Sequence, residues 1–203
     1  MINRCFNCGQ SNVDKIIKQN GTQIICSECG HESPFLQLPL YIVSGAGGTG
    51  KSTICYYLTG KMNNYVILDT DILWQEEFNI PENNYRKYFE TWLKVAKNIS
   101  QSGRPVVLFG TGFGVPDNIE HCNDRKFFKK IHYLSLYCQE NELKRRLEKR
   151  QNWSLSQIEN QLEFNKWFKN YDKELEPKID LIETTDKDLV ETIEEVKNWI
   201  NSK

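Results

Sequence analysis

The first residues with evident chemistry form a glycine-rich segment, Gly-Ala-Gly-Gly-Thr-Gly-Lys-Ser, at positions 45–52. A short apolar run at 40–44 precedes it and predicts a strand, and residues 53–58 after it predict a helix. This is the G-x-x-x-x-G-K-S pattern in the strand–loop–helix context that a phosphate-binding loop requires. Glycines let successive backbone N–H groups turn toward a phosphate chain, and the helix N-terminus adds favourable partial charge. The sequence therefore predicts a nucleotide-binding loop.

This loop assigns roles to individual residues. Lys51 should reach the β- and γ-phosphates, which makes it a catalytic candidate, and the Ser52 hydroxyl should ligate Mg²⁺. ATP is the expected nucleotide, and the residues alone leave GTP open. The predicted nucleotide-binding residues are Gly45, Gly47, Gly48, Thr49, Gly50, Lys51, Ser52 and Thr53.

A pair of carboxylates, Asp69 and Asp71, ends the next apolar run at 65–68. In an open α/β sheet, ligands bind beyond the carboxyl ends of the strands. Alternate residues on an extended segment point to one side, so both carboxylates are expected to face one cleft. Phosphoryl transfer needs one acidic group for the Mg²⁺ shell and one to accept a proton. A solvated turn or a helix cap is the alternative.

A third apolar run, 105–109, ends in Gly110-Thr111-Gly112 rather than in an acidic residue. Because no carboxylate follows this strand, the Asp69/Asp71 pair becomes the expected organiser of the magnesium. Glycines at a strand end allow a ligand to approach the backbone closely. Gly110, Thr111 and Gly112 are therefore predicted to face the substrate, with a plain strand-to-loop exit as the alternative.

Four of the seven cysteines lie near the N-terminus, in two C-x2-C pairs separated by 17 residues: Cys5, Cys8, Cys26 and Cys29. This spacing is typical of a structural zinc site with four thiolate ligands. Asn20-Gly21 between two β-prone runs, 13–17 and 22–25, predicts a hairpin. The segment resembles a zinc ribbon. Because it carries three basic and three acidic residues, nucleic-acid binding is disfavoured and a structural or protein-docking role is preferred.

The remaining elements follow from hydrophobic periodicity. Residues 82–102 predict a helix with aromatic residues at helical spacing, and strands are expected at 131–137 and 179–183. Arg86, near those aromatics, either meets an acidic group on the acceptor or is solvated. A helix at 140–150 carries Arg146 and Arg150 four residues apart, and a capping box at Ser154/Gln157 or Ser156/Glu159 opens a further helix. A last amphipathic helix should end near residue 200.

The composition limits the alternatives. With 26 basic and 27 acidic residues among 203, the net charge of −1 argues against a protein that mainly binds nucleic-acid backbones. Hydrophobic residues at 39% can supply a core. No apolar run reaches the roughly 18 residues of a membrane span, and the N-terminus lacks a signal-peptide pattern. We therefore expect a cytoplasmic protein without a membrane partner.

Taken together, residues 45–52, Asp69-Thr70-Asp71, 110–114 and the later Arg-rich helix resemble the P-loop small-molecule kinase group, which includes shikimate, gluconate and nucleoside kinases. The resemblance implies an α/β three-layer P-loop fold with a mainly parallel five-stranded sheet over residues 39–203. The zinc ribbon expected at 1–36 departs from the usual pattern of this group. It also implies that Asp69 helps hold Mg²⁺ and that Asp71 is the base that meets the acceptor hydroxyl. Arg146 and Arg150 become lid residues, with Arg145 in reserve and a salt-bridged surface helix as the alternative. Thr184 and Thr185 become candidate nucleotide contacts.

The expected activity is transfer of the γ-phosphoryl group of ATP to an alcohol group on a small molecule, plausibly a nucleoside or polyol. The cofactors implied are ATP, Mg²⁺ and Zn²⁺. One alternative is a polynucleotide 5′-hydroxyl kinase whose ribbon steers the strand. Another is an ATP-regulated binding protein whose ribbon docks a protein partner.

Overall fold

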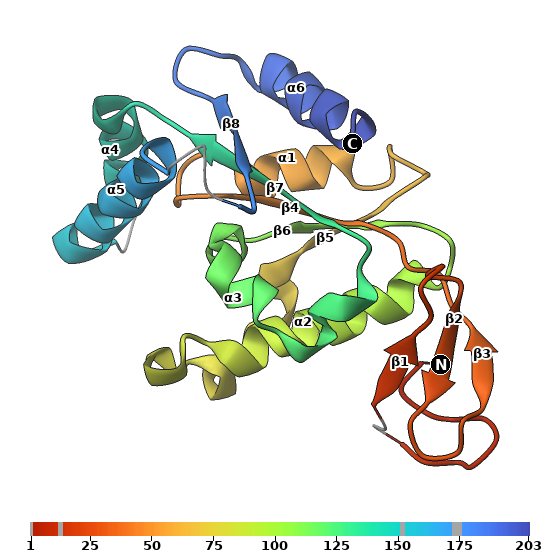
Figure 1. Cartoon of the computed structure of the whole chain (residues 1–203). Helices are drawn as coiled ribbons and strands as arrows, with labels where there is room; N and C mark the ends of the chain where they lie inside the picture. Colours follow the sequence, from red (N-terminus) through yellow and green to blue (C-terminus); the bar gives the residue numbers. More distant parts are fainter. Residues whose placement is uncertain (1, 12–13, 151–152, 172–175) are drawn as a thin grey trace.

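The computed structural model describes residues 2–11, 14–150, 153–171 and 176–203, and it contains two sheets of different size (Figure 1). Near the N-terminus is a small antiparallel sheet, in which β2 (Gln23–Cys26) pairs with β1 (Lys15–Ile17) and with β3 (Glu32–Pro34). The predicted hairpin at Asn20-Gly21 is confirmed: Asn20 Oδ1 accepts a hydrogen bond from the Thr22 amide at 3.1 Å. The third strand has no counterpart in the sequence prediction, and Val13, placed in the first predicted run, lies outside the described residues.

The larger sheet contains five parallel strands in the order β5-β6-β4-β7-β8. Its strands are β4 (Leu40–Gly45), β5 (Val66–Asp69), β6 (Val106–Phe109), β7 (Ile131–Tyr137) and β8 (Ile179–Glu183). The first strand of this sheet in the chain, β4, is therefore central. The expected fold class, a three-layer α/β P-loop fold with a five-stranded parallel sheet behind a small ribbon, is confirmed.

Helices cover both faces of this sheet because its strands are apolar on both sides. On β4, Leu40 and Ile42 pack against one helix layer, and Tyr41 and Val43 pack against the other. Alternate residues of a strand point to opposite faces, so a continuous apolar run is the pattern of a strand buried on both sides. One layer contains α2 (Arg86–Ser100), α3 (Pro116–Glu120) and α5 (Leu155–Lys169); the other contains α1 (Lys51–Leu58) and α6 (Leu189–Asn201).

The predicted helices are present with shifted boundaries. The aromatic helix α2 begins at Arg86 rather than near residue 82, because 3₁₀ turns occupy Glu76–Phe78 and Pro81–Asn83. The Arg-rich helix α4 (Glu140–Glu148) ends before Arg150. The Ser154/Gln157 capping box is confirmed at the start of α5. No helix in the described ranges combines the length and apolar character that a membrane crossing requires.

The ribbon packs on the end of the large sheet where β4 begins (Figure 1). Ile2, Ile24 and Phe35 form an apolar cluster with Phe127, and the Phe35 and Phe127 rings meet edge to face at 5.8 Å. The Gln101 side chain, just after α2, exchanges two hydrogen bonds with the backbone of Leu36, each 3.0 Å. The phosphate-binding loop follows the other end of β4. The ribbon and that loop therefore lie at opposite ends of the strand.

Candidate active site

The loop at 45–52 connects β4 to α1 in the strand–loop–helix arrangement that the sequence predicts. Gly50 caps α1 with φ +100°, a left-handed conformation that favours glycine. Among the residues that the structure describes, no side chain caps α1, so the first amides of this helix can bind an anion. Lys51 Nζ donates hydrogen bonds to the carbonyl oxygens of Gly45 at 2.8 Å and Ala46 at 2.9 Å. The residues present fit a nucleotide phosphate chain.

A cavity of about 220 Å³ opens over this loop and brings most of the predicted residues together. Its lining combines the loop, the carboxyl ends of β5 and β6, and three residues from beyond α4, Arg150, Trp153 and Gln161. The predicted residues that line it are Gly47, Gly48, Gly50, Lys51, Ser52, Thr53, Asp69, Asp71, Gly110, Thr111 and Arg150. Gly45 and Thr49 are not among the lining residues that the structure describes: Thr49 is buried and its Oγ1 donates to the Ala46 carbonyl at 2.8 Å, inside the loop.

The two carboxylates reach this cavity by a local geometry that differs from the prediction. β5 ends at Asp69, and Thr70–Leu73 is a 3₁₀ helix rather than an extended segment. The Asp69 carboxylate caps this turn by accepting a hydrogen bond from the Asp71 amide at 3.0 Å. The expected extended Asp-x-Asp is therefore wrong, although Asp69 and Asp71 still line one cavity.

Burial, modified by neighbouring charges, shifts two pKa values in this cavity. The pKa of Lys51 is lowered to about 8, chiefly by burial and also by Arg150, whereas Asp71 and Asp69 oppose the shift. Burial raises the pKa of Asp71, and the neighbouring Asp69 charge adds to the effect. A carboxyl group with a raised pKa is a stronger proton acceptor when ionised. The arrangement can hold polyphosphate and a divalent cation beside a carboxylate base.

A second cavity of about 240 Å³ adjoins the first and shares Asp71 and Thr111 with it. Aromatic side chains dominate its lining: Trp74, Tyr85, Tyr88, Phe89 and Phe113, accompanied by Thr70, Asn79 and Gly112. The Trp74 ring meets the Tyr88 ring edge to face, with ring centroids 5.1 Å apart. Asn84 and Tyr85 both have positive φ, +53° and +56°, and such residues cluster at functional sites. The cavity has the character of an acceptor pocket.

The carbonyl oxygen of Thr70 holds the segment between the two carboxylates in place. It accepts hydrogen bonds from Tyr88 Oη at 2.6 Å and Trp92 Nε1 at 3.1 Å, both from α2. Trp92 is almost fully buried, so its indole cannot leave without opening the core. The aromatic residues of α2 therefore serve both packing and the position of the site.

Helix α5 supplies two contacts to the loop that sequence reasoning missed. Gln161 Oε1 accepts a hydrogen bond from the Gly47 amide at 2.6 Å. A side chain at Gly47 would lie 2.9 Å from the Trp153 ring, so the indole packs directly on the loop. Arg150 lies over the same ring, 5.2 Å from its centroid. No local sequence signal links α5 to the loop.

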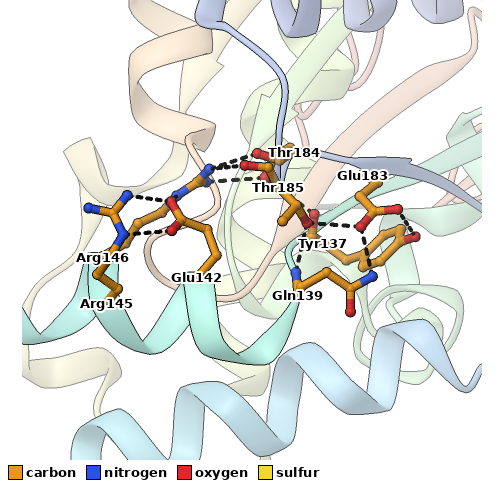
Figure 2. Close-up of polar contacts among 8 residues, drawn as sticks. All are labelled: Tyr137, Gln139, Glu142, Arg145, Arg146, Glu183, Thr184 and Thr185. Atoms are coloured by element: carbon orange, nitrogen blue, oxygen red, sulfur yellow. Dashed lines mark hydrogen bonds and ion pairs between the residues drawn. The ribbon is translucent and has the colours of Figure 1, made fainter.

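Arg146, predicted as a lid residue, does not line the phosphate cavity among the described residues, and this placement corrects the prediction. Figure 2 shows its guanidinium turned toward the loop after β8, where it donates to the Thr184 carbonyl at 2.7 Å and to Thr185 O at 3.3 Å. Glu142 holds Arg146 from the other side, at 2.8 Å, and also pairs with the reserve candidate Arg145 at 2.6 Å. The physical reason is that α4 ends at Glu148, so Arg146 and Arg150 do not share a helical face.

Arg86 is also placed differently from the prediction. It pairs with Glu90 one turn along α2, at 3.3 Å, and does not line either cavity among the described residues. Tyr85 and Tyr88 face the acceptor pocket, and the helical rotation between residues carries Arg86 away from it. The substrate-contact role proposed for Arg86 is therefore not supported by its position.

The four N-terminal cysteines meet in one cluster. All four sulfur atoms lie within 4.8 Å of one another, with Cys5 and Cys29 Sγ atoms 3.6 Å apart and Cys8 and Cys26 Sγ atoms 3.9 Å apart. Tetrahedral ligation at about 2.3 Å places sulfur atoms about 3.8 Å apart, so the cluster fits one zinc ion. A disulfide needs sulfur atoms about 2.0 Å apart, which these are not.

The fold and the cavity over its glycine-rich loop define a P-loop nucleotide-binding protein. A family model described as an AAA domain (AAA_18) matches residues 42–165, more than half of the chain, and the chain belongs to this family. No curated protein sequence matches the chain significantly.

Solved structures support the fold. An unliganded sugar kinase from Janibacter sp. HTCC2649 is similar over 81% of this chain and 95% of its own, with a TM-score of 0.56 and 17% identity. A putative kinase from Chloroflexus aurantiacus J-10-fl is similar over 82% and 97%, with a TM-score of 0.54 and 17% identity. Thymidylate kinase from Candida albicans is similar over 82% and 92%, with a TM-score of 0.53 and 14% identity. At these identities, the likeness shows the fold alone.

Proposed function

We propose that this protein is an ATP-dependent kinase that transfers the γ-phosphoryl group to a hydroxyl of a small molecule. The observation that carries the proposal is the pair of adjoining cavities with Asp71 at their boundary. One cavity has the backbone amides and the lysine of a phosphate site, and the other has the aromatic lining of an organic ligand site. A carboxylate shared by both can contact an acceptor hydroxyl and lies beside the phosphate loop.

The residues of the chain divide the work of this reaction. Bound ATP and Mg²⁺ would supply the phosphoryl group and neutralise its charge. Lys51 and the amides at the start of α1 would hold the phosphates, and Ser52 with Asp69 would hold the metal. Asp71 would orient the acceptor and take its hydroxyl proton, because its raised pKa suits a general base. Arg150 is the guanidinium available from the lid side.

A nucleoside is the acceptor class that we infer from the second cavity. Five aromatic side chains converge there, and planar rings bind such surfaces by stacking and edge contacts. Asn79 and Thr111 add polar groups that can orient a ligand. Phosphorylation of a polyol rather than a nucleoside in the assay below would contradict this inference.

We also propose that residues 1–36 form a zinc-binding ribbon and residues 39–203 the kinase-like domain. The alternative of a polynucleotide kinase with a steering ribbon has no support in the arrangement. The ribbon packs where β4 begins, whereas the phosphate loop follows its end (Figure 1). A strand bound to the ribbon would have to cross the length of the sheet to reach Asp71.

The test is a panel of nucleosides and sugars scored for ATP-dependent phosphorylation by the unaltered chain, Lys51→Ala and Asp71→Asn. We expect a nucleoside to be phosphorylated, with Lys51→Ala losing nucleotide binding and Asp71→Asn keeping it while losing transfer at least about 100-fold. Asp117→Asn, an exposed position on α3, is the matched control and should behave as wild type. Transfer by Asp71→Asn at the wild-type rate would remove Asp71 as the base. If only sugars in the panel were phosphorylated, a polyol would replace a nucleoside as the inferred acceptor. If no compound were phosphorylated, the proposal of a kinase would be overturned.

A further inference from the structure

The ribbon contains a buried lysine on the side that faces α2. Lys15 in β1 is 4% exposed, whereas the next residue, Ile16, is 55% exposed. Neighbouring residues of a strand point to opposite faces, so a polar side chain is inside and an apolar one outside. Apolar residues are usually buried and lysines usually exposed, so β1 shows the reverse arrangement. Exceptions to such patterns are most frequent at functional or strained positions.

The metal-site cysteines fix this orientation. Lys15 stands directly opposite Cys26 in the β1–β2 ladder, so both side chains lie on the same face of the ribbon. Cys26 is buried and its sulfur belongs to the four-sulfur cluster. A one-residue slip would expose Lys15, but it would also break the pairing that places Cys26.

Within the part of the chain that the structure describes, the Lys15 ammonium has no hydrogen-bond, ion-pair or ring partner. Three carboxylates line the space beside it, and each one is paired elsewhere. Asp14 pairs with Lys126 at 2.5 Å, Asp124 with Lys97 at 2.8 Å, and Glu90 with Arg86 at 3.3 Å. The stem of Lys15 is buried, but its ammonium group keeps contact with the adjoining cavities, where an unpaired positive charge favours an anion.

Two cavities meet at Lys15. The first, of about 930 Å³, lies between the ribbon and the end of α2, and apolar residues make up much of its lining, including Ile24, Phe35 and Leu36. The second, of about 460 Å³, continues along α2 and is lined by Lys87 and Lys94. Volumes of 300–1,000 Å³ with apolar walls and few polar groups are typical of small-molecule sites.

We propose that these cavities form a second ligand site, separate from the phosphate loop, for a small anion with an apolar or planar body. The anionic head, a phosphate ester or a carboxylate, pairs with Lys15. The body of the ligand lies against Ile24, Phe35 and Leu36. The site belongs to the ribbon end of the molecule, and it does not depend on the reaction proposed above.

The test uses three probes with one ring system: 1-naphthyl phosphate, 1-naphthoate and neutral 1-naphthol. They are titrated by fluorescence into the full-length chain carrying Lys51→Ala, so that the phosphate loop does not compete. We expect at least one of the two anions to bind about tenfold or more tightly than 1-naphthol, because hydrogen bonds to charged groups contribute that much. Whichever anion binds more tightly identifies the head group. Equal binding of all three probes would overturn the proposal.

Substitutions then locate the cation. Lys15→Met should weaken binding of the anion about tenfold or more, and Lys15→Arg should retain it. Lys18→Met removes the same charge from the exposed side of the ribbon, where Lys18 pairs with Glu32 at 2.7 Å, and should leave binding unchanged. Unchanged binding in a folded Lys15→Met would overturn the proposal.

A variant that fails to fold does not remove the test, because hydrogen exchange can locate the probe on the chain with Lys15 intact. Bound anion should protect amides of β1 and the end of α2. Protection confined to residues 45–52 would contradict a second site.

Discussion

Raising the pH from 7 to 9 should weaken nucleotide binding through the titration of Lys51. This side chain is 9% exposed, and burial lowers its pKa to about 8 from the ordinary 10.5. The shift corresponds to a cost of about 3 kcal/mol for holding the ammonium charged in the nucleotide-free site. Phosphate oxygens stabilise the charged ammonium when nucleotide binds, so nucleotide binds best to the protonated form of Lys51. The same shift makes the free protein more stable as the pH rises from about 8 to 10.5.

The size of the effect follows from the protonated fraction. With a pKa of about 8, Lys51 is roughly 90% protonated at pH 7 and roughly 10% protonated at pH 9. If only the protonated form binds well, affinity falls about tenfold across this interval, with most of the loss above pH 8. Asp71 raises the pKa of Lys51, so Asp71→Asn should move the fall to lower pH.

The assay is titration of a fluorescent ATP analogue with Mg²⁺ at constant ionic strength and at pH 7, 8 and 9. Lys51→Arg is the matched control, because a guanidinium stays charged throughout this range. Its affinity should be lower than that of wild type but flat with pH. A flat wild-type profile, or an equal fall in Lys51→Arg, would refute the role of Lys51 protonation.

Two further variants test contacts described above. Gln161→Ala should tighten nucleotide binding up to about fivefold, because it frees the Gly47 amide from a hydrogen bond of about 1 kcal/mol. Asn160→Ala, at an exposed position on the same helix, is the control and should leave the affinity unchanged. Weaker binding by Gln161→Ala would show that Gln161 contacts the nucleotide instead. Metal analysis should find about one zinc per chain. Cys26→Ser should lose the zinc and lower the unfolding temperature, whereas Cys55→Ser, outside the cluster, should keep it. A folded, metal-free wild-type ribbon would contradict the four-thiolate site.

The phosphate-binding loop is predictable from the sequence because all of its parts are consecutive. Glycines, Lys51 and Ser52 lie between an apolar run and a helix start, and each feature constrains the backbone locally. Asp69 and Asp71 follow from the same logic, since the ends of parallel strands meet at one edge of the sheet. The error at the second carboxylate is local as well. The Asp69 side chain caps a 3₁₀ turn, a competition between side chain and backbone that strand patterns do not show.

Contacts between distant segments are not predictable in this way. Gln161 is 114 residues from Gly47, and the packing of α5 against α4, β4 and β7 brings it there. The packing of α5 against α4 uses Leu143, Leu147 and Ile158, and helical periodicity alone does not say which element such residues contact. The acceptor pocket also depends on tertiary packing. In the sequence its aromatic residues have the pattern of core residues, and only the fold places them beside Asp71.

The position of Arg146 differs from the prediction because that prediction depended on where a helix ends, whereas Arg150 does line the cavity. A spacing of four residues puts Arg146 and Arg150 on one face only if α4 continues through both. The helix ends at Glu148, and the turn after it directs Arg150 into the phosphate cavity beside Trp153. Arg146 remains on the helix and binds the carbonyls at Thr184 and Thr185. Helix boundaries are the least certain feature of a sequence pattern, so a site assignment that crosses one inherits its error.

The ribbon shows why a hydrophobic pattern cannot assign faces in a strand of three residues. Alternation in β1 would place Ile16 inside and Lys15 outside, because burial of the apolar side chain is favourable. The ladder instead pairs Lys15 with Cys26, and the cysteine must keep its sulfur in the cluster. Four thiolates around one metal contribute far more free energy than the burial of one isoleucine, so the cysteines decide the register. In such a module, the positions of the metal-binding cysteines therefore determine which face of each strand is buried, and this explains why Lys15 rather than Ile16 lies inside.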